Sequence, residues 1–300
     1  MKWAVSVSLG SSKRDTDQVI ELLGEQVRIE RRGVDGDVAA ARALIAELDG
    51  RADAIGLGGI DLFVQWAGAR YFFREARHLA RAATRTPVVC GAGLKHTLER
   101  RTVALLEPSL RWQGRRVLVT SAVDRFGMTE ALGQHGADLR FGDLAFVLGL
   151  PVFLRSPQVL DAVARTIGPV VVRLPFKWIY STGSAQDKTS TSERYAHMYR
   201  WAEVVAGDWH IIRRHAPMRL DGLTVLTNTT TRSDVAFLRA AGATRLVTTT
   251  PRYGGRSLAT NLLEAAFVAI HGDYLDAAAY ERALDAMAYR PTEIPLDEDV

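Results

Sequence analysis

The sequence predicts an α/β fold, a doubly wound parallel sheet of Rossmann-like type preceded by a smaller α/β domain. Six short apolar segments follow Gly114, and segments of helical periodicity separate most of them, a pattern typical of parallel βαβ units. The 300 residues are 47% apolar and 24% charged, which supplies enough apolar material for a core. The stretch Pro108–Gly114 indicates a boundary between two domains. We therefore expect a possible substrate domain at 1–112 and a dinucleotide-binding domain with C-terminal helices at 113–300.

The first domain is expected to mix short strands with helices. Val19–Leu23 and Val27–Arg31 flank Gly24-Glu25, which predicts a β-hairpin. Helical spacing of apolar residues predicts a helix over Val38–Leu48 that ends near Gly50. The other expected elements are strands at Trp3–Leu9, Ala54–Leu57 and Val88–Cys90, and helices at Arg74–Ala83 and Lys95–Leu106.

The second domain has a more regular alternation. Six strands in two halves is the number found in a dinucleotide-binding domain. The expected strands are Arg116–Ala122, Ala137–Phe141, Val170–Leu174, Glu203–Ala206, Leu223–Thr227 and Arg245–Thr249. The expected helices are Gly127–His135, Pro157–Ile167, Ser190–Trp201, Ser233–Ala241, Ser257–His271 and Leu275–Ala288, and the acidic tail Glu293–Val300 is expected to fray.

Cysteine content and charge exclude several classes of protein. Cys90 is the one cysteine, so an internal disulfide and a metal site built on several thiolates are excluded. The net charge of +4 comes from 38 basic and 34 acidic residues, and 33 of the basic residues are arginines spread along the chain. Nucleic-acid binders cluster their charge, so we expect no nucleic-acid partner.

We expect no membrane partner. The longest uncharged apolar run, Leu144–Leu154, has 11 residues and contains Pro151, whereas a spanning helix needs about 20. The segment Met1–Leu9 alternates apolar residues with serine, which favours a first strand over a signal peptide. These features predict a cytoplasmic protein with a small-molecule substrate, and they are compatible with a homo-oligomer.

The loop after the first strand of the second domain is the expected cofactor site. A dinucleotide fingerprint has the form Gly-x-Gly-x-x-Gly, and only its third glycine is present, as Gly127. Asp124 stands where the pyrophosphate comes closest, and Arg125 can compensate its charge. Asp143 ends the next strand, 21 residues after Ala122, a spacing that suits the ribose 2′-OH and favours NAD over NADP. The alternative is a sheet without a dinucleotide, in which Asp143 caps a loop.

Ligands of such sheets bind beyond the carboxyl ends of the strands, where this chain carries many small, hydroxylated and cationic residues. Such residues suit an anion or a polyol, although the threonine-rich loops also suit helix capping and turns. The expected cofactor-binding residues are Ser121, Ala122, Arg125, Gly127, Asp143, Gly207 and Thr227. The expected substrate-binding residues are Lys13, Lys177, Arg252 and Arg256.

Lysine is rare, with 5 residues against 33 arginines, and its pKa can be lowered for acid–base work. Lys95, beside His96, is therefore the candidate general base, unless both are ordinary polar residues of a first helical turn. Asp208 and His210 follow the fourth strand, where they suit proton transfer or, less well, metal binding. The alternative is a solvated turn. We expect no metal.

Seven segments together resemble a prokaryotic family labelled quinate 5-dehydrogenase. They are SVSLGSSKRD at 6–15, AIGLGGID at 54–61, GLKHTLER at 93–100, SAVDRFGM at 121–128, WAEVVAGD at 201–208, TVLTNTTT at 224–231 and LVTTTP at 246–251. The resemblance spans nearly the whole chain and implies NAD(P)-linked oxidation of the quinate 5-hydroxyl to a ketone. The layout is similar to that of shikimate and quinate dehydrogenases, but their Asn-Val-Thr-x-Pro-x-Lys motif is absent, so their Lys/Asp catalytic pair is not transferred.

Two main hypotheses follow. The first is an NAD(P)-dependent oxidoreductase of a small polyhydroxy acid, with Lys95 as general base assisted by Asp208 or His210. The second is a non-redox α/β protein that binds an anionic metabolite or a nucleotide, which Asp124 in the phosphate turn favours. An RNA-binding protein is a third and weaker hypothesis.

Overall fold

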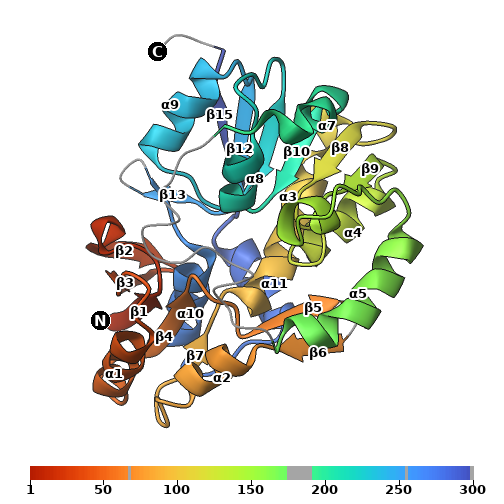
Figure 1. Ribbon diagram of the computed structural model, residues 1–300. Coiled ribbons are helices and arrows are strands. Elements are labelled where there is room, and N and C mark those ends of the chain that lie inside the picture. The colour runs from red at the N-terminus through yellow and green to blue at the C-terminus, as the bar shows by residue number, and fades with distance from the viewer. Residues whose placement is uncertain (67–68, 174–190, 254–255, 298–300) are drawn as a thin grey trace. The chain divides into compact units, whose positions relative to one another are not determined.

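The computed structural model describes residues 1–66, 69–173, 191–253 and 256–297. The chain divides into two compact units, each of which contains its own parallel sheet (Figure 1). Unit 1 comprises Met1–Thr97, Arg165–Lys188 and Ala259–Tyr289, and unit 2 comprises Leu98–Ala164, Thr189–Leu258 and Arg290–Val300. The α/β fold class predicted from the sequence is confirmed.

The sheet of unit 1 has five strands in the order β2-β3-β1-β4-β7. β1 lies parallel to β3 and β4, β7 lies parallel to β4, and β2 pairs antiparallel with β3. The predicted hairpin is confirmed: Leu23 (φ 54°) and Gly24 (φ 77°) form the two-residue turn, in which positive φ matches the twist of the strands. The bounds are β1 Lys2–Ser8, β2 Thr16–Leu22, β3 Glu25–Gly33, β4 Ala54–Gly58 and β7 Val88–Val89.

Helices cover both faces of this sheet. Val5 and Val7 share a core with α1 (Val38–Leu48) and α2 (Arg74–Ala80). Ser6 points to the opposite face, because successive strand residues alternate, and its Oγ accepts a hydrogen bond of 2.6 Å from Asn261 Nδ2 of α10. α10 spans Thr260–His271, and α11 spans Ala277–Ala286.

The position of α10 corrects the expected domain division. The sequence analysis placed the C-terminal helices in the second domain, whereas α10 packs against β1, β3, β4 and β7 of unit 1. Every residue from Asn261 to Ala269 is buried, and a helix that is apolar all round needs cover on all sides. The second face of the first sheet covers one side of α10, where Gly56 lets the backbone of Asn261 approach closely.

The sheet of unit 2 has six strands in the order β15-β12-β11-β10-β8-β9. β9, β8, β10, β11 and β12 run parallel, and β15 pairs antiparallel with β12. Counted from β8, the parallel order is 2-1-3-4-5, the flavodoxin-like form of a doubly wound sheet rather than the expected order of a six-stranded dinucleotide domain. The bounds are β8 Arg116–Val119, β9 Asp138–Phe141, β10 Val204–Gly207, β11 Thr224–Thr227, β12 Arg245–Thr248 and β15 Thr292–Pro295.

Two predictions in this region were wrong, one of a strand and one of a frayed tail. α5 (Pro157–Val171) covers the first two residues of the segment expected as the strand Val170–Leu174, Val172 and Arg173 follow in a turn, and Leu174 lies outside the described residues. Valines favour strands only weakly, and burial overrides that preference; Val172 is buried in the core of unit 1. The tail expected to fray forms β15 instead, because Ile294 packs against the core of unit 2.

The helices of unit 2 pack on its sheet through an apolar core. Strand residues such as Leu118, Val205 and Val225 share this core with Tyr199, Trp209 and Leu238 of the helices. The helices of this unit are α4 Phe126–Gln134, α7 Ala196–Trp201, α8 Trp209–His215 and α9 Arg232–Ala240. The division between the units falls within α3 (Ala92–Leu110) and within α5. Within the described part of the chain, no helix has both the length and the apolar character needed to cross a membrane.

Candidate functional site

The strand order of unit 2 locates a candidate site. The chain leaves β8 toward β9 on one side and returns to β10 on the other, so the order reverses between β8 and β10. In open α/β sheets, ligands bind beyond the carboxyl ends of the strands at this switch point. The loops that follow β8 and β10 contain Ser121, Arg125, Gly207 and Asp208, which the sequence analysis had selected.

A buried arginine stands at the centre of this edge. The Nη1 of Arg125 lies 2.8 Å from Oε1 of Glu99, and its Nη2 lies 2.8 Å from Oδ2 of Asp208. Asp124 contributes a third carboxylate, 3.1 Å from Nε. Only 5% of the Arg125 side chain is exposed. Burial alone would lower the pKa of Arg125, but the three carboxylates outweigh it and raise that pKa well above its ordinary value.

Asn228 extends this group along the edge toward β11. Its Nδ2 donates a 3.0 Å hydrogen bond to Oδ2 of Asp208, and its Oδ1 accepts one of 3.1 Å from the backbone N–H of Trp209. We call Glu99, Asp124, Arg125, Asp208 and Asn228 the Arg125 cluster. Asp208 is 19% exposed in its side chain and Asn228 is half-buried, so part of the cluster is open to solvent.

Two buried polar atoms at this edge lack a hydrogen-bond partner among the described residues. They are Nε of Arg125, whose ion pair with Asp124 does not have hydrogen-bond geometry, and Oγ1 of Thr230 in the loop after β11. Buried polar groups are rarely left unsatisfied. Their presence at the switch point is consistent with a bound molecule or with water.

Gly207 is required at the end of β10. Its φ of +142° is a conformation that residues with a side chain rarely adopt. A Cβ there would overlap Oγ1 of Thr120 at the end of β8. The absence of a side chain therefore allows β8 and β10 to end close together and brings Arg125 within reach of Asp208.

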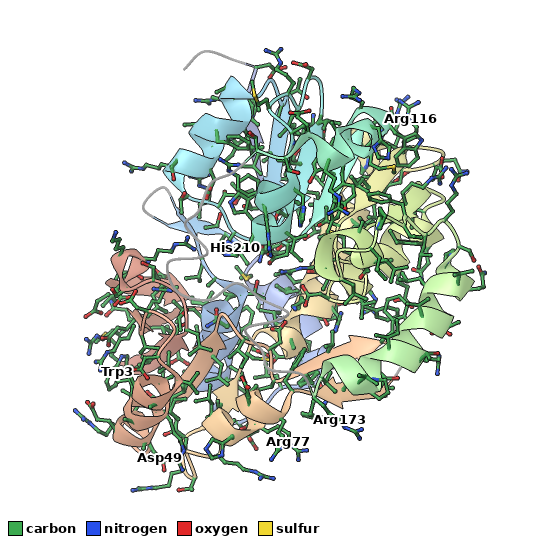
Figure 2. The ribbon with its side chains drawn as sticks, in the orientation of Figure 1. Trp3, Asp49, Arg77, Arg116, Arg173 and His210 are labelled. Atoms are coloured by element: carbon green, nitrogen blue, oxygen red, sulfur yellow. The ribbon has the colours of Figure 1, made fainter. Side chains whose placement is uncertain are left out.

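Asp208 and His210 do not form a carboxylate–imidazole pair. Asp208 is the N-cap of α8, and its Oδ1 accepts a 2.9 Å hydrogen bond from the backbone N–H of His210. Figure 2 shows His210 in the first turn of α8, where its side chain is partly exposed. The geometry thus gives Asp208 a capping role as well as its place in the Arg125 cluster.

The carboxylate of Asp143 accepts hydrogen bonds from the backbone N–H groups that were expected to bind a phosphate. Its two Oδ atoms accept hydrogen bonds from the backbone N–H groups of Ala122 and Val123, at 3.0 and 2.9 Å. The carboxylate therefore caps the loop after β8, which was the alternative to binding a ribose. Burial raises the pKa of Asp143 to about 6, although the two backbone donors act to lower it.

We expect the Asp143→Asn variant to lose a pH dependence that the native protein shows. Because the folded pKa of about 6 exceeds the ordinary value of about 3.9, the unfolded chain releases this proton first as the pH rises. The free energy of unfolding of the native protein should therefore fall between about pH 4 and 6, by of order 2–3 kcal/mol.

Urea unfolding at several pH values checks this expectation. Asp221→Asn is a control of opposite sign, because a hydrogen bond from Arg219 lowers the pKa of Asp221 and its contribution is lost as the pH falls. Identical pH profiles for the native protein and Asp143→Asn would contradict the assigned role.

The other residues predicted to bind a cofactor lie at the same edge. Oγ of Ser121 accepts a long bond of 3.5 Å from the N–H of Asp208, and Oγ1 of Thr227 donates one of 2.8 Å to the carbonyl of Gly207. Gly127 is buried in the first turn of α4. Glu99 and Asn228 lie in two of the segments that carry the family resemblance but were not selected as site residues; Glu99 comes 26 residues before Arg125.

Lys95 belongs to unit 1 and pairs with Asp61. Its Nζ lies 3.3 Å from Oδ2 of Asp61, and the two side chains are 7% and 18% exposed. Lys95 is in the first turn of α3, after β7, and Asp61 follows β4. The pair thus lies at the carboxyl edge of the first sheet. The predicted assistants Asp208 and His210 belong to unit 2. Asp61 ends a glycine-rich turn that the sequence analysis noted in the resemblance but did not select.

A second carboxylate caps a loop in unit 1. Glu264 of α10 accepts hydrogen bonds from the backbone N–H groups of Gly91 and Leu94, at the start of α3, and from the Tyr280 hydroxyl at 2.7 Å. Burial raises the pKa of Glu264, and these donors act to lower it. The sequence analysis missed this residue because it lies 173 positions from Gly91.

The four predicted substrate-binding residues do not form one described group. Lys13 is exposed in a short 3₁₀-helix after β1. Lys177 lies outside the described residues. Arg252 is in β13 (Arg252–Tyr253), and Arg256, whose side chain lies outside the described set, is in β14 (Arg256–Ser257). In the part of the chain that is described, no three or more His, Cys, Asp and Glu side chains are placed to hold a metal ion.

The fold and the site define a two-unit α/β protein with polar groups at the carboxyl edge of each parallel sheet. Residues 93–295 match the family described as "Domain of unknown function (DUF8754)", and the chain belongs to this family. Residues 3–90 match a second model, "Domain of unknown function (DUF8753)". No curated protein matches the chain.

Solved structures match the chain at low sequence identity and with low TM-scores. A sugar ABC transport substrate-binding protein from Bordetella parapertussis is 13% identical, with a TM-score of 0.41 over 100% of this chain and 92% of that one. A glutamate dehydrogenase from Thermus thermophilus is 14% identical, with a TM-score of 0.44 over 96% and 73%. A solute-binding protein from Agrobacterium vitis, with bound allitol, is 12% identical, with a TM-score of 0.36 over 99% and 96%. Because these scores lie below 0.5, we draw no function from them.

Proposed function

We propose that the chain is a non-redox binding protein for a small, neutral, polyhydroxylated metabolite, and that the ligand lies against the Arg125 cluster. The observation that carries the proposal is the arrangement of Arg125, Asp208 and Asn228 at the switch point of unit 2. Carboxylates only accept hydrogen bonds, a guanidinium only donates them, and an amide does both. A polyol presents hydroxyl groups that both donate and accept, so it can satisfy all three.

The charge of the cluster favours a neutral ligand over an anionic one. Three carboxylates surround one guanidinium, so these four side chains together have a formal charge of −2. Repulsion between like charges is strong where water is excluded, and this edge is largely buried. This preference keeps the non-redox binding protein of the second hypothesis but departs from the anionic metabolite or nucleotide that the hypothesis expected.

A dinucleotide fits these residues poorly. The N–H groups of Ala122 and Val123, which would face the pyrophosphate, already donate to Asp143. Asp124 adds negative charge at the same loop. We therefore derive no step that passes through NAD or NADP.

Calorimetric titration with ribose, arabinose, ribitol and quinate tests the proposal. We expect at least one neutral member of this set to bind 1:1 and more tightly than quinate. Asn228→Ala should weaken binding at least tenfold, because it removes a hydrogen-bonding amide from the edge, and a tenfold change is about 1.4 kcal/mol.

Gln134→Ala is the matched control, since Gln134 is an exposed amide of the same unit. Its affinity should equal that of the native protein, and thermal unfolding would show that both variants are folded. Tighter binding of quinate than of every neutral sugar would contradict the proposed charge preference.

An NAD(P)-dependent dehydrogenase of a quinate-like acid is the second candidate. The buried pair of Lys95 and Asp61 favours it, because a lysine held beside a carboxylate is suited to proton transfer, and the family that the sequence resembles implies this reaction. A change in nicotinamide absorbance during incubation with quinate would support this candidate over the first.

A further inference from the structure

A groove on unit 2 shares no residue with the Arg125 cluster. It has a volume of about 390 Å³ and lies along one side of α9. The described residues that line it are Arg232, Val235, Ala236, Arg239, Arg252 and Ile294, which we call the Arg232 groove. Half of these residues are arginines, whereas arginine makes up 33 of the 300 residues of the chain. The enrichment marks this groove as a local concentration of positive charge.

The helix orders the charges along the groove. Residues at i, i+3, i+4 and i+7 share one face of a helix, so Arg232, Val235, Ala236 and Arg239 form one stripe of α9. Arg232 and Arg239 therefore stand at the two ends of the stripe, about 10 Å apart at 1.5 Å per residue, with aliphatic side chains between them. Ile294 of β15 extends the aliphatic surface.

The guanidinium of Arg252 interacts electrostatically with Arg232, at one end of the stripe on α9. Burial and the nearby charge of Arg232 both lower the pKa of Arg252, so the two cations interact unfavourably.

We propose that the Arg232 groove binds a phosphomonoester with an apolar body. The phosphate would lie between Arg232 and Arg252, and the body would cover Val235, Ala236 and Ile294. A phosphate offers three acceptor oxygens and a charge near −2, which matches two guanidinium groups better than a single carboxylate does.

Titration with phenyl phosphate, inorganic phosphate and benzoate tests this proposal. Calorimetry measures the binding of all three, and ³¹P NMR measures the binding of the two phosphates. Phenyl phosphate should bind most tightly, because it alone has both the phosphate and the apolar body. Its affinity should rise between about pH 5 and 7 as the second phosphate proton, with a pKa near 6, is lost.

Arg232→Gln should weaken the binding of phenyl phosphate at least tenfold, and Arg252→Gln should do the same. Arg232 is exposed on α9, so its variant should fold even if the half-buried Arg252 does not tolerate change. Arg155→Gln is the matched control, since Arg155 is an exposed arginine of the same unit and its variant should keep native affinity.

Three results would overturn the proposal. They are no binding of phenyl phosphate by the native protein at millimolar concentration and low salt, equal weakening in Arg155→Gln and Arg232→Gln, and binding of benzoate as tight as that of phenyl phosphate. None of them bears on sugar binding at the Arg125 cluster, so the two proposals fail separately.

Discussion

Replacement of Arg125 by methionine is expected to lower the free energy of unfolding by about 3–5 kcal/mol at neutral pH. Methionine fills much of the same space but leaves the carboxylates of Glu99, Asp124 and Asp208 without their shared cation. Glu99 is fully buried, so water cannot replace the lost partner. Urea unfolding at pH 7.5 measures the loss, and part of it should be recovered at lower pH as carboxylates take up protons.

Arg219→Met is the matched control for this prediction. Arg219 also pairs with an aspartate of unit 2, Asp221, but the two side chains are 70% and 60% exposed. Exposed ion pairs contribute little, typically about 0–1 kcal/mol. Equal losses in the Arg125 and Arg219 variants would show that the buried cluster has no special role in stability.

Replacement of Gly207 by alanine is expected to cost about 3 kcal/mol. One part is backbone strain, of order 1–3 kcal/mol, because φ is +142° at this position. The other part is the overlap of the new Cβ with Oγ1 of Thr120, since overpacking a filled interior costs about 1–3 kcal/mol. The change should also weaken ligand binding, because Gly207 precedes Asp208.

The double variant Gly207→Ala with Thr120→Ala separates the cost of backbone strain from the cost of the overlap. Removal of the Thr120 hydroxyl relieves the overlap but not the strain, so the double variant should be more stable than Gly207→Ala alone. Thr120→Ala by itself supplies the reference for this comparison, because Thr120 is fully buried and loses a methyl group together with a hydroxyl that makes a long bond of 3.4 Å to the carbonyl of Ala206. Simple additivity of the two changes would argue against the overlap.

Local pattern was enough to predict most of the fold. The hairpin at Gly24 could be predicted because its turn needs positive φ, and α1 could be predicted from its apolar spacing. The failures lie where long-range packing decides. The sequence gives α10 an apolar surface but does not say which sheet it covers; the contact between Asn261 and Ser6, 255 positions apart, settles that.

The location of the candidate site was easier to predict than the side-chain contacts within it. Loops after parallel strands meet at one edge, so Arg125, Gly207 and Asp208 could be selected from strand positions alone. Their contacts join residues 26 and 83 positions apart, and no local pattern encodes such distances. Asp143 shows the same limit: its spacing suited a ribose contact, and its geometry instead caps the loop of Ala122.

Calorimetric titration of the folded protein with ribose, arabinose and ribitol, and then with NAD⁺ and NADP⁺, tests the central proposal most directly. We predict 1:1 binding of a neutral sugar or polyol, weakened at least tenfold in Asn228→Ala, and no heat of binding from NAD⁺ to the native protein or from NADP⁺ to Arg232→Gln. Tight binding of NAD⁺ that Asp143→Ala weakens, together with no binding of any neutral polyol, would contradict the account and place the dehydrogenase first.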